Sequence, residues 1–429
     1  MPDKLAIRGG TPVRQAPFPE WPVFGREEEE ALLRVLHSRK WWQFAYPETA
    51  APAEDQPPAP RSEVNAFQEE FAAYHGCRFG IAAANGTATL EIILRSMNIG
   101  PGDEVIVPPY TFVASASAVL LVGAVPIFAD ICPDTLNLDP ARIEDALSPR
   151  TRAVMPVHFG GQSADMDAIG AIARKHRLRV VEDAAHAHGA EWRGRKCGSL
   201  GDAGSFSFQA SKNMTAGEGG IITTSDADLA DLCRSYLWAG RKTGRPWYEH
   251  HRLGWNYRIT EFQGAILRAQ LGRLTEQTLR RDANGRFLAE ELRKIPGIRP
   301  TRLDERATRV SFHLFMFRYE PEAFSGMTRD EFLAALNAEG IPCSGGYIHP
   351  LHRNPMFLNK DFWKDGFPCV PPFARDIDYA DFTERCPASE AVCRDAVWIV
   401  QNMLLGTRED TADIATAVAK IQAAQAPKA

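Results

Sequence analysis

The sequence predicts an α/β protein in which helices cover both faces of a mostly parallel β-sheet. Between residues 79 and 182, short apolar runs alternate with segments of helical periodicity, an order that is typical of such sheets. The chain of 429 residues suits two or three domains of roughly 100–200 residues each. Its apolar content of 45% is that of an ordinary globular protein. We expect a large α/β domain over residues 1–280 and a smaller α+β domain over residues 281–429.

The N-terminal part begins with an extended leader and one helix. Gly25 precedes a helix over residues 26–39, with acids in its first turn and Arg39 and Lys40 at its end, as the helix dipole favours. Residues 47–61 are rich in Pro and Ala and have no periodicity. We therefore expect an inserted loop there, which is either a plain spacer or a cover for a pocket.

The alternating region begins at Ser62, which caps a helix that Gly76 ends. Apolar runs typical of buried strands and helical patterns then follow in regular order. Strands are expected at 79–84, 104–108, 125–130, 153–157 and 179–182, and helices at 87–97, 111–121, 140–147 and 165–176. Ligands of such sheets bind beyond the carboxyl ends of the strands, so side chains at those ends are the first candidates for a site.

The second half of the chain is less regular. A helix is predicted over 227–237, a long helix over 261–295, and then a strand and two helices over 311–319, 328–339 and 408–425. Residues 342–387 are rich in Pro and aromatic residues, which indicates a loop-rich segment.

Composition and charge argue against several classes of protein. The formal net charge is -5 at pH 7, with acids and bases spread along the chain, so no nucleic-acid or anionic-membrane surface is expected. The start, MPDKLAIRGG, lacks the apolar segment of a secretory signal, and the apolar stretch 113–129 is broken by Ser, Gly and Pro, unlike a membrane span. Eight irregularly spaced cysteines fit a reducing cytoplasm better than a disulfide framework or a zinc site.

One loop stands out as a candidate catalytic segment. Residues 203–220 read AGSFSFQASKNMTAGEGG; the alternating run 205–208 predicts a half-buried strand, and a polar turn with Lys212 follows it. A lysine on a tight loop between two core strands can be partly desolvated, which lowers the pKa of its amine, as a Schiff-base nucleophile requires. The alternative is a lysine that merely points into solvent.

Three further strand ends carry residues suited to a ligand. Asp183 could be an ordinary helix cap, but a buried carboxylate beside a cationic ring stays ionised and keeps that ring protonated. The turn Asn85-Gly86-Thr87 opens a helix, and its N–H groups and hydroxyl suit a phosphate, although an ordinary strand-to-helix turn has similar residues. Phe112 could stack on an aromatic ligand or belong to the core.

These four elements predict more together than each does alone. In chain order they offer a phosphate-binding loop, a stacking aromatic, a carboxylate for a ring nitrogen and a lysine. Pyridoxal phosphate (PLP) requires this combination: a lysine for the Schiff base, an acid for the pyridine nitrogen and a cradle for the phosphate. The residues therefore predict a PLP enzyme without a metal site.

The chain resembles the DegT/DnrJ/StrS aminotransferases, which are sugar- and cyclitol-modifying enzymes of the fold-type I PLP class. The resemblance extends over nearly the whole chain and is clearest in NGTATLEIIL, PGDEVIVPPYTFVASASAV, VVEDAAHAHGA, GDAGSFSFQASKNMTAGEGGIITT and LGWNYRITEFQGAI. It implies a large domain with a mostly parallel, seven-stranded type of sheet and a smaller C-terminal domain.

The resemblance also implies roles for individual residues. Lys212 matches the lysine that forms the Schiff base and moves protons, and Asp183 matches the partner of the pyridine nitrogen. His186 matches a contact to the ring hydroxyl. The remaining cofactor contacts match the stacking residue Phe112 and the phosphate-binding residues Gly86, Thr87, Ser207 and Asn256.

Two further implications concern the subunits and the substrate. Relatives donate the residue that matches Asn256 from the neighbouring subunit, so a homodimer with shared active sites is implied. Tyr347 and His352, in GGYIHPLH, lie in a region that often meets the substrate.

The implied activity is transfer of an amino group from L-glutamate or L-glutamine to the ketone of a keto-sugar nucleotide or a keto-cyclitol, through the pyridoxamine form (PMP) of the cofactor. The run Gln209-Ala210-Ser211 stands where sugar-nucleotide enzymes commonly have a His-Pro-Thr-like run. Together with the long C-terminal region, it resembles the branch that acts on cyclitol ketones and aminoshikimate-type substrates.

Other functions remain open at this point. A groove for a nucleotide could come from Arg241, Lys242, Arg245 and Trp247, although an exposed charged loop explains these residues as well. A PMP-dependent sugar dehydratase is one alternative, but such relatives have histidine in place of Lys212. A non-catalytic sensor or scaffold with the same fold is the other.

Overall fold

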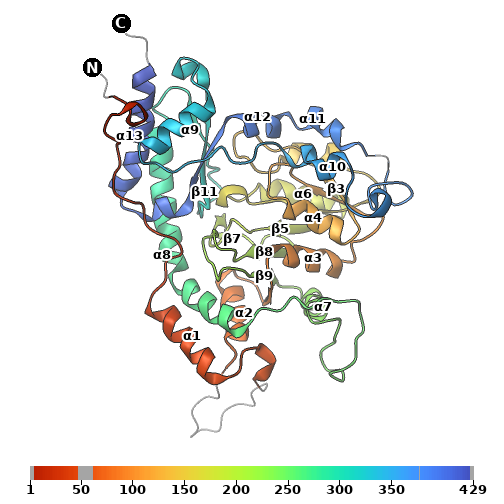
Figure 1. Cartoon of the computed structure of the whole chain (residues 1–429). Helices are drawn as coiled ribbons and strands as arrows, with labels where there is room; N and C mark the ends of the chain where they lie inside the picture. Colours follow the sequence, from red (N-terminus) through yellow and green to blue (C-terminus); the bar gives the residue numbers. More distant parts are fainter. Residues whose placement is uncertain (1–3, 47–60, 376, 426–429) are drawn as a thin grey trace.

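The computed structural model describes residues 4–46, 61–375 and 377–425. Most of the expected inserted loop, residues 47–60, lies outside the described residues. The centre of the molecule is a seven-stranded sheet with the order β1-β9-β8-β5-β4-β2-β3 (Figure 1). Six strands run parallel and β9 is antiparallel to both of its neighbours, so the expected α/β fold with a mostly parallel sheet is confirmed.

The strands of this sheet are short and almost wholly buried. They are β1 (Phe79–Ala83), β2 (Glu104–Val107), β3 (Val125–Phe128), β4 (Thr151–Val154), β5 (Arg179–Asp183), β8 (Ala203–Ser207) and β9 (Gly220–Thr224). Strand β8 is buried along its whole length, whereas the alternating sequence predicted a half-buried strand. The reason is its place between β5 and β9, where its polar Ser205 bonds Thr89 Oγ1 at 2.6 Å.

Five of the six helices that flank the sheet begin at a polar cap residue, and the exception is the helix that follows Val113. Ser62 accepts a hydrogen bond from Asn65 N–H, and Asn85 accepts one from Ala88 N–H, as N-cap residues do. These helices are α2 (Glu63–Tyr74), α3 (Gly86–Ser96), α4 (Ala114–Leu121), α5 (Pro140–Ala146), α6 (Met166–His176) and α7 (Ala227–Leu237).

Helix α4 begins three residues later than the sequence predicts. Residues 109–112 form a turn instead, in which Thr111 Oγ1 lies 3.0 Å from Ser115 Oγ. This turn leaves the side chain of Phe112 outside the core.

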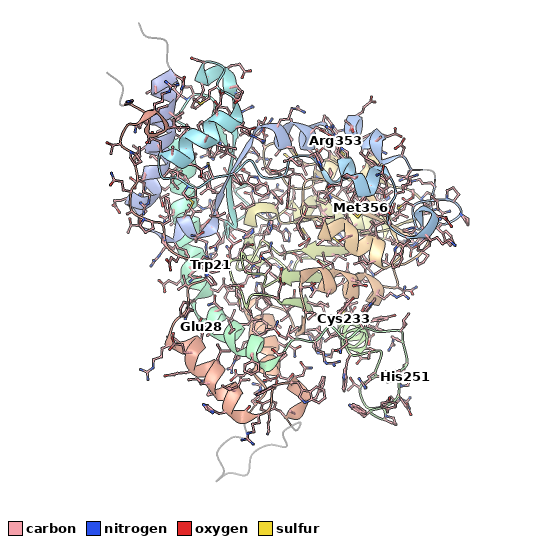
Figure 2. The ribbon with its side chains drawn as sticks, viewed as in Figure 1. Trp21, Glu28, Cys233, His251, Arg353 and Met356 are labelled. Carbon is pink, nitrogen blue, oxygen red and sulfur yellow. The ribbon has the colours of Figure 1, made fainter. Side chains whose placement is uncertain are left out.

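A long helix, α8 (Glu261–Leu292), runs beside the sheet and packs against α2 and α1 (Arg26–Ser38). Trp21 and Glu28 of the N-terminal arm lie beside it (Figure 2). Glu28 accepts hydrogen bonds from Gln270 and Arg273 of α8, and Trp21 Nε1 donates to the carbonyl of Ala210 at 2.9 Å. The arm therefore holds α8 and the loop that carries Lys212 in one assembly.

The second sheet is antiparallel and has the order β10-β11-β12. Its strands are β10 (Ile298–Pro300), β11 (Leu314–Tyr319) and β12 (Ala396–Val400), and a small hairpin is formed by β6 (Glu191–Trp192) and β7 (Arg195–Lys196). Helices α9 (Arg329–Ala338) and α13 (Arg408–Gln425) pack on one another next to the second sheet (Figure 1). The boundary expected at residue 280 falls inside α8.

The loop-rich segment 342–387 covers the β3 edge of the central sheet. Phe128 of β3 packs against the rings of Phe357, Tyr379 and Phe382, and Tyr379 Oη donates to the carbonyl of Pro126 at 3.0 Å. The helices after β11 in this part of the chain are α10 (Pro355–Leu358), α11 (Phe382–Arg385) and α12 (Pro387–Asp395).

Short 3-10 turns complete the fold: η1 (Ala6–Arg8), η2 (Gln43–Ala45), η3 (Phe159–Gly161), η4 (Pro321–Phe324), η5 (Leu351–Arg353), η6 (Lys364–Gly366), η7 (Tyr379–Asp381) and η8 (Gln401–Leu405). Among the residues that the structure describes, no helix is both long and apolar enough to cross a membrane.

Candidate active site

A cavity of about 650 Å³ opens at the carboxyl ends of the parallel strands. Its walls come from the start of α3, the turn after β2, the ends of β5 and β8, and the loop between β8 and β9. Seven residues selected from the sequence line it together: Gly86, Thr87, Phe112, Asp183, His186, Ser207 and Lys212.

Lys212 lies on the loop between β8 and β9, where its N–H donates to the carbonyl of Gln209 at 2.9 Å. Burial lowers the pKa of its amine to about 8, and the negative charge of Asp183 opposes this shift. Near neutral pH, the fraction of Lys212 in the neutral, nucleophilic form is therefore much larger than for a solvent-exposed lysine. The alternative of a lysine that merely points into solvent does not fit these surroundings.

Asp183 ends strand β5 and is 6% exposed. Its carboxylate accepts hydrogen bonds from Ser115 Oγ at 2.7 Å and from the N–H of Ala185 at 3.2 Å. Burial raises the pKa of this carboxyl, while the hydrogen bonds and the charge of Lys212 oppose the rise. A cation bound next to the carboxylate would lower its pKa again, so the site suits a protonated ring nitrogen.

His186 is a neutral imidazole at the cavity wall. Its Nδ1 accepts a hydrogen bond from the N–H of Gly160 at 3.3 Å, and burial together with the charge of Lys212 holds the pKa of His186 well below its usual value. An Nδ1 that accepts places the proton on Nε2, which is then a hydrogen-bond donor. The ring packs against that of His313 at 4.2 Å.

The start of α3 offers an anion cradle. Asn85 caps the N–H of Ala88, so within the described chain the N–H groups of Gly86 and Thr87 have no internal partner. A helix N-terminus of this kind attracts phosphate. The cradle depends on close backbone contact, because a Cβ on Gly86 would lie only 2.8 Å from Ser207 Cβ.

Phe112 is 57% exposed although it borders the cavity. A core phenylalanine, the alternative that the sequence left open, would be buried. The exposed ring instead offers a flat apolar face to a planar ligand.

The structure does not bring the other three selected residues into this cavity. Asn256 is exposed and its backbone pairs with Trp238. Tyr347 packs among Tyr110, Phe159 and Trp398.

His352 is fully buried, and its Nε2 lies 3.0 Å from Glu390 Oε1. Its ring faces those of Phe128 and Phe382, where the loop-rich segment 342–387 covers β3. His352 was expected near the substrate because it closely follows Tyr347 in the pattern GGYIHPLH. In the structure, the turn after Tyr347 instead places His352 in the segment that covers β3.

Several lining residues escaped the sequence analysis. Thr111 stands in the same motif as Phe112, and Tyr257 directly follows Asn256. Thr111 and Tyr257 line the cavity, as does Glu91, whose pKa is raised by burial. Their closeness to known motif residues was the available signal for Thr111 and Tyr257, whereas nothing in the sequence distinguishes Glu91 from an ordinary helical glutamate.

The donor set fits PLP. The N-terminus of α3 with the hydroxyl groups of Thr87 and of Ser207 on β8 suits the phosphate. Asp183 suits the ring nitrogen, and the lowered pKa of Lys212 suits attack on the aldehyde. Within the described ranges, no group of His, Cys, Asp and Glu could hold a metal ion.

Fold and cavity together define a fold-type I PLP-dependent enzyme. The DegT/DnrJ/EryC1/StrS aminotransferase family matches residues 59–418, and this chain belongs to that family. It is a PLP-dependent aminotransferase.

Two relatives and one solved structure illustrate the family. A Micromonospora echinospora protein named for L-glutamine:3-amino-2,3-dideoxy-scyllo-inosose aminotransferase activity is 40% identical over 98% of both chains. The L-glutamine:2-deoxy-scyllo-inosose aminotransferase of Streptoalloteichus tenebrarius is 39% identical over 98% of both chains. The crystal structure of 3-amino-5-hydroxybenzoic acid synthase superposes with a TM-score of 0.83 at 36% identity, covering 96% of this chain and 100% of that one.

Proposed function

We propose that the enzyme moves an amino group from L-glutamine to the ketone of a keto-cyclitol. The observation that carries this proposal is the charge of the cavity. Among the residues that line it, Lys212 carries the one positively charged side chain, whereas Asp183, Glu91 and Glu218 are acids. Such a lining suits an uncharged polyol ketone better than the diphosphate of a sugar nucleotide, which binds to Arg and Lys.

The named activities of the relatives support the same acceptor class. Two of them are named for transfer of an amino group from L-glutamine to scyllo-inososes, and they match this chain over almost its full length. L-Glutamate remains the second donor to be tested. Gln209, which lines the cavity, also agrees with the cyclitol-type branch expected from the sequence.

Each residue of the cavity has a distinct task in this reaction. When bound, the cofactor supplies an electron sink for the carbon that loses its proton. Asp183 would hold the proton on the ring nitrogen, and Nε2–H of His186 would donate to the ring hydroxyl. Lys212 Nζ would take the proton from the donor Cα and return one later, a role that typically contributes ~10²–10⁴-fold in rate.

The rest of the cavity would bind and orient the cofactor. Phe112 would cover one face of the ring and exclude water from it. The N–H groups of Gly86 and Thr87 and the hydroxyl of Ser207 would hold the phosphate. Ser207 Oγ accepts from the N–H of Gln209 at 3.3 Å, which leaves its own proton for an anion.

The proposal includes a homodimer with shared active sites. Asn256 is exposed and lies outside the cavity of its own chain, which supports a role in the cavity of a second copy. The loop after α7, which carries His251, extends away from the body of the molecule (Figure 2). It exposes large apolar side chains, among them Trp247, Tyr248 and Leu253, and such a surface suits a partner.

The proposal also includes the division into domains and the location of the protein. The chain would form a large domain around the seven-stranded sheet and a smaller one around the three-stranded sheet, with α8 reaching into both. A cytoplasmic location is supported by the cysteines, since all eight are free thiols.

The test measures the two half-reactions separately, so that the amino donor and the ketone acceptor are identified independently. The PLP form of the purified enzyme is mixed with L-glutamine, L-glutamate or a control amino acid, and loss of visible absorption reports the first half-reaction. The PMP form is then mixed with 2-deoxy-scyllo-inosose or with a nucleoside-diphosphate-linked keto-sugar. We expect bleaching by L-glutamine and recovery with the inosose. Recovery with the nucleotide sugar alone would overturn the acceptor assignment.

A further inference from the structure

The carboxylate of Asp183 is held by two hydrogen bonds of different origin. The N–H of Ala185 donates to Oδ1 at 3.2 Å from within the same turn. Ser115 Oγ donates to Oδ2 at 2.7 Å from helix α4, 68 residues earlier in the chain. The second bond is the shorter one, and it comes from a side chain that is fully buried.

The hydroxyl of Ser115 is itself oriented by Thr111. The two hydroxyl oxygens lie 3.0 Å apart. An ionised carboxylate only accepts, so the single proton of Ser115 is directed to Asp183. Thr111 must then be the donor to Ser115, which gives a directed chain from Thr111 through Ser115 to Asp183. Thr111 borders the cavity, and the same turn carries Phe112.

We propose that Ser115 is a positioning residue, which with the help of Thr111 fixes the Asp183 carboxylate in the orientation that receives the ring nitrogen of the cofactor. The turn after β2 and the start of α4 would thus set two sides of the site. Phe112 of the turn covers the ring face, and Ser115 of α4 holds the carboxylate at the ring edge. This inference rests on the proposed role of Asp183.

The bond matters because the carboxylate is buried. Without Ser115, the N–H of Ala185 is the one remaining hydrogen-bond donor to Asp183 that the described chain supplies, and a buried carboxyl with fewer donors protonates more readily. The other titratable groups around it are Lys212, on the loop after β8, His158, after β4, and Tyr347, after α9. None of these is altered by a change at position 115.

The test compares Ser115→Ala with Ser115→Thr, which keeps the hydroxyl. Equilibrium dialysis measures the affinity for PLP as a function of pH. In Ser115→Ala, we expect PLP to bind about 10-fold more weakly at pH 7, and the acidic limb of the profile to move up by about 1–2 pH units, the shift expected from losing one charge-assisted hydrogen bond. Ser115→Thr should keep the PLP affinity and the acidic limb of the parent enzyme. Thr111→Val should move the acidic limb up by a smaller amount than Ser115→Ala does.

Ser117→Ala is the matched control. Ser117 lies on the same helix, is partly buried and makes no side-chain hydrogen bond within the described chain, so its removal should leave the profile in place. An unchanged profile in Ser115→Ala, or an equal shift in Ser117→Ala, would overturn the inference.

Asp183→Asn separates this inference from the proposed function. If Asp183→Asn binds PLP like the parent enzyme, the role of Asp183 is wrong and the proposed mechanism fails with it. If Asp183→Asn loses PLP while Ser115→Ala keeps normal affinity at every pH, only the role of Ser115 is wrong.

Discussion

At the scale of single residues, the site shifts the pKa values of its ionisable side chains away from their values in water. Lys212 has a lowered pKa, Asp183 a raised one, and His186 is held neutral, all chiefly because they are buried. Lys212 and Asp183 also act on one another, since each charge favours the ionised form of the other. A bound cation at Asp183 would therefore change the behaviour of the lysine as well.

The pKa of Lys212 gives the first prediction. Only the neutral amine attacks an aldehyde, so the rate at which the apoprotein takes up PLP should rise with pH, with a midpoint near pH 8. In Asp183→Asn the midpoint should move down, because the negative charge that raises the pKa of Lys212 is lost. Stopped-flow absorbance between about pH 6 and pH 10 measures both. A midpoint near 10.5, the ordinary value for lysine, would contradict the prediction.

The second prediction concerns the phosphate cradle. Gly86→Ala should weaken PLP binding by at least about 10-fold, because its Cβ would meet Ser207 Cβ at 2.8 Å and force α3 away from β8. Gly272→Ala is the control, since a Cβ at this position in α8 has open space around it. This control should stabilise the helix by about 0.5–1 kcal/mol. Fluorescence titration with PLP and urea unfolding would measure the two effects, and equal PLP affinities would rule the cradle out.

At the scale of elements, the N-terminal arm supports the site from outside. The arm joins α8 through Glu28 and touches the loop of Lys212 through Trp21. Burial alone would raise the pKa of Glu28, but hydrogen bonds from Arg273, Gly25 and Gln270 outweigh it and lower the pKa. The ionised form of Glu28 is therefore favoured in the folded state.

Glu28→Gln should lower the free energy of unfolding by about 2–3 kcal/mol at pH 7, the usual contribution of a hydrogen-bonded buried charge. Because the folded-state pKa lies below the unfolded value of about 4.5, this contribution is complete above that value and shrinks as the pH falls further. Glu29→Gln, at an exposed position on the same helix, should change little. Urea unfolding at pH 7 and near pH 4 tests the trend, and a difference that grows with acid would contradict it.

The elements also show what the sequence could and could not predict. Periodicity located the strands and helices between residues 62 and 183 because local pattern determines them. It could not show that β9 enters the sheet antiparallel between β1 and β8, since strand order follows from long-range pairing. The three-residue strand β10 and the hairpin β6–β7 are too short to produce a periodic signal.

The residues of the candidate site also differ in whether the sequence could predict them. Lys212, Asp183 and the Gly86-Thr87 turn stand at strand ends, where chemistry can be expected from position. Ser115 could not be recognised, because a serine inside a helical pattern gains its meaning only when folding brings it next to Asp183. His352 is close to Tyr347 in the sequence, but the turn between them places its ring against Phe128 of β3 and outside the cavity.

At the scale of the whole molecule, the proposed homodimer with shared active sites makes a quantitative prediction. Lys212→Ala and Asn256→Ala should each impair the homodimer, the first by removing the catalytic amine and the second by weakening PLP binding. A mixed dimer contains one cavity in which Lys212 and the partner subunit's Asn256 are both intact. Random assortment of a two-fold symmetric dimer should then restore about a quarter of the parent activity.

The measurement is transaminase activity after the two variants are unfolded together and refolded, with each variant refolded alone as the control. Activity no higher than the average of the two separate variants would show that each cavity is complete within one chain, and the shared-site proposal would be wrong.

The late position of β9 has a consequence for how the enzyme is made. Within the large sheet, β1 pairs with β9 alone, and Gly220 of β9 must press against the carbonyl of Asn85, since a Cβ there would lie 2.6 Å from that oxygen. The Gly86-Thr87 turn therefore leaves the ribosome on the order of ten seconds before the strand that packs against it. A nascent chain can take up this vitamin B6 derivative only after β9 has emerged, so chains that terminate before β9 will not sequester the cell's supply of it.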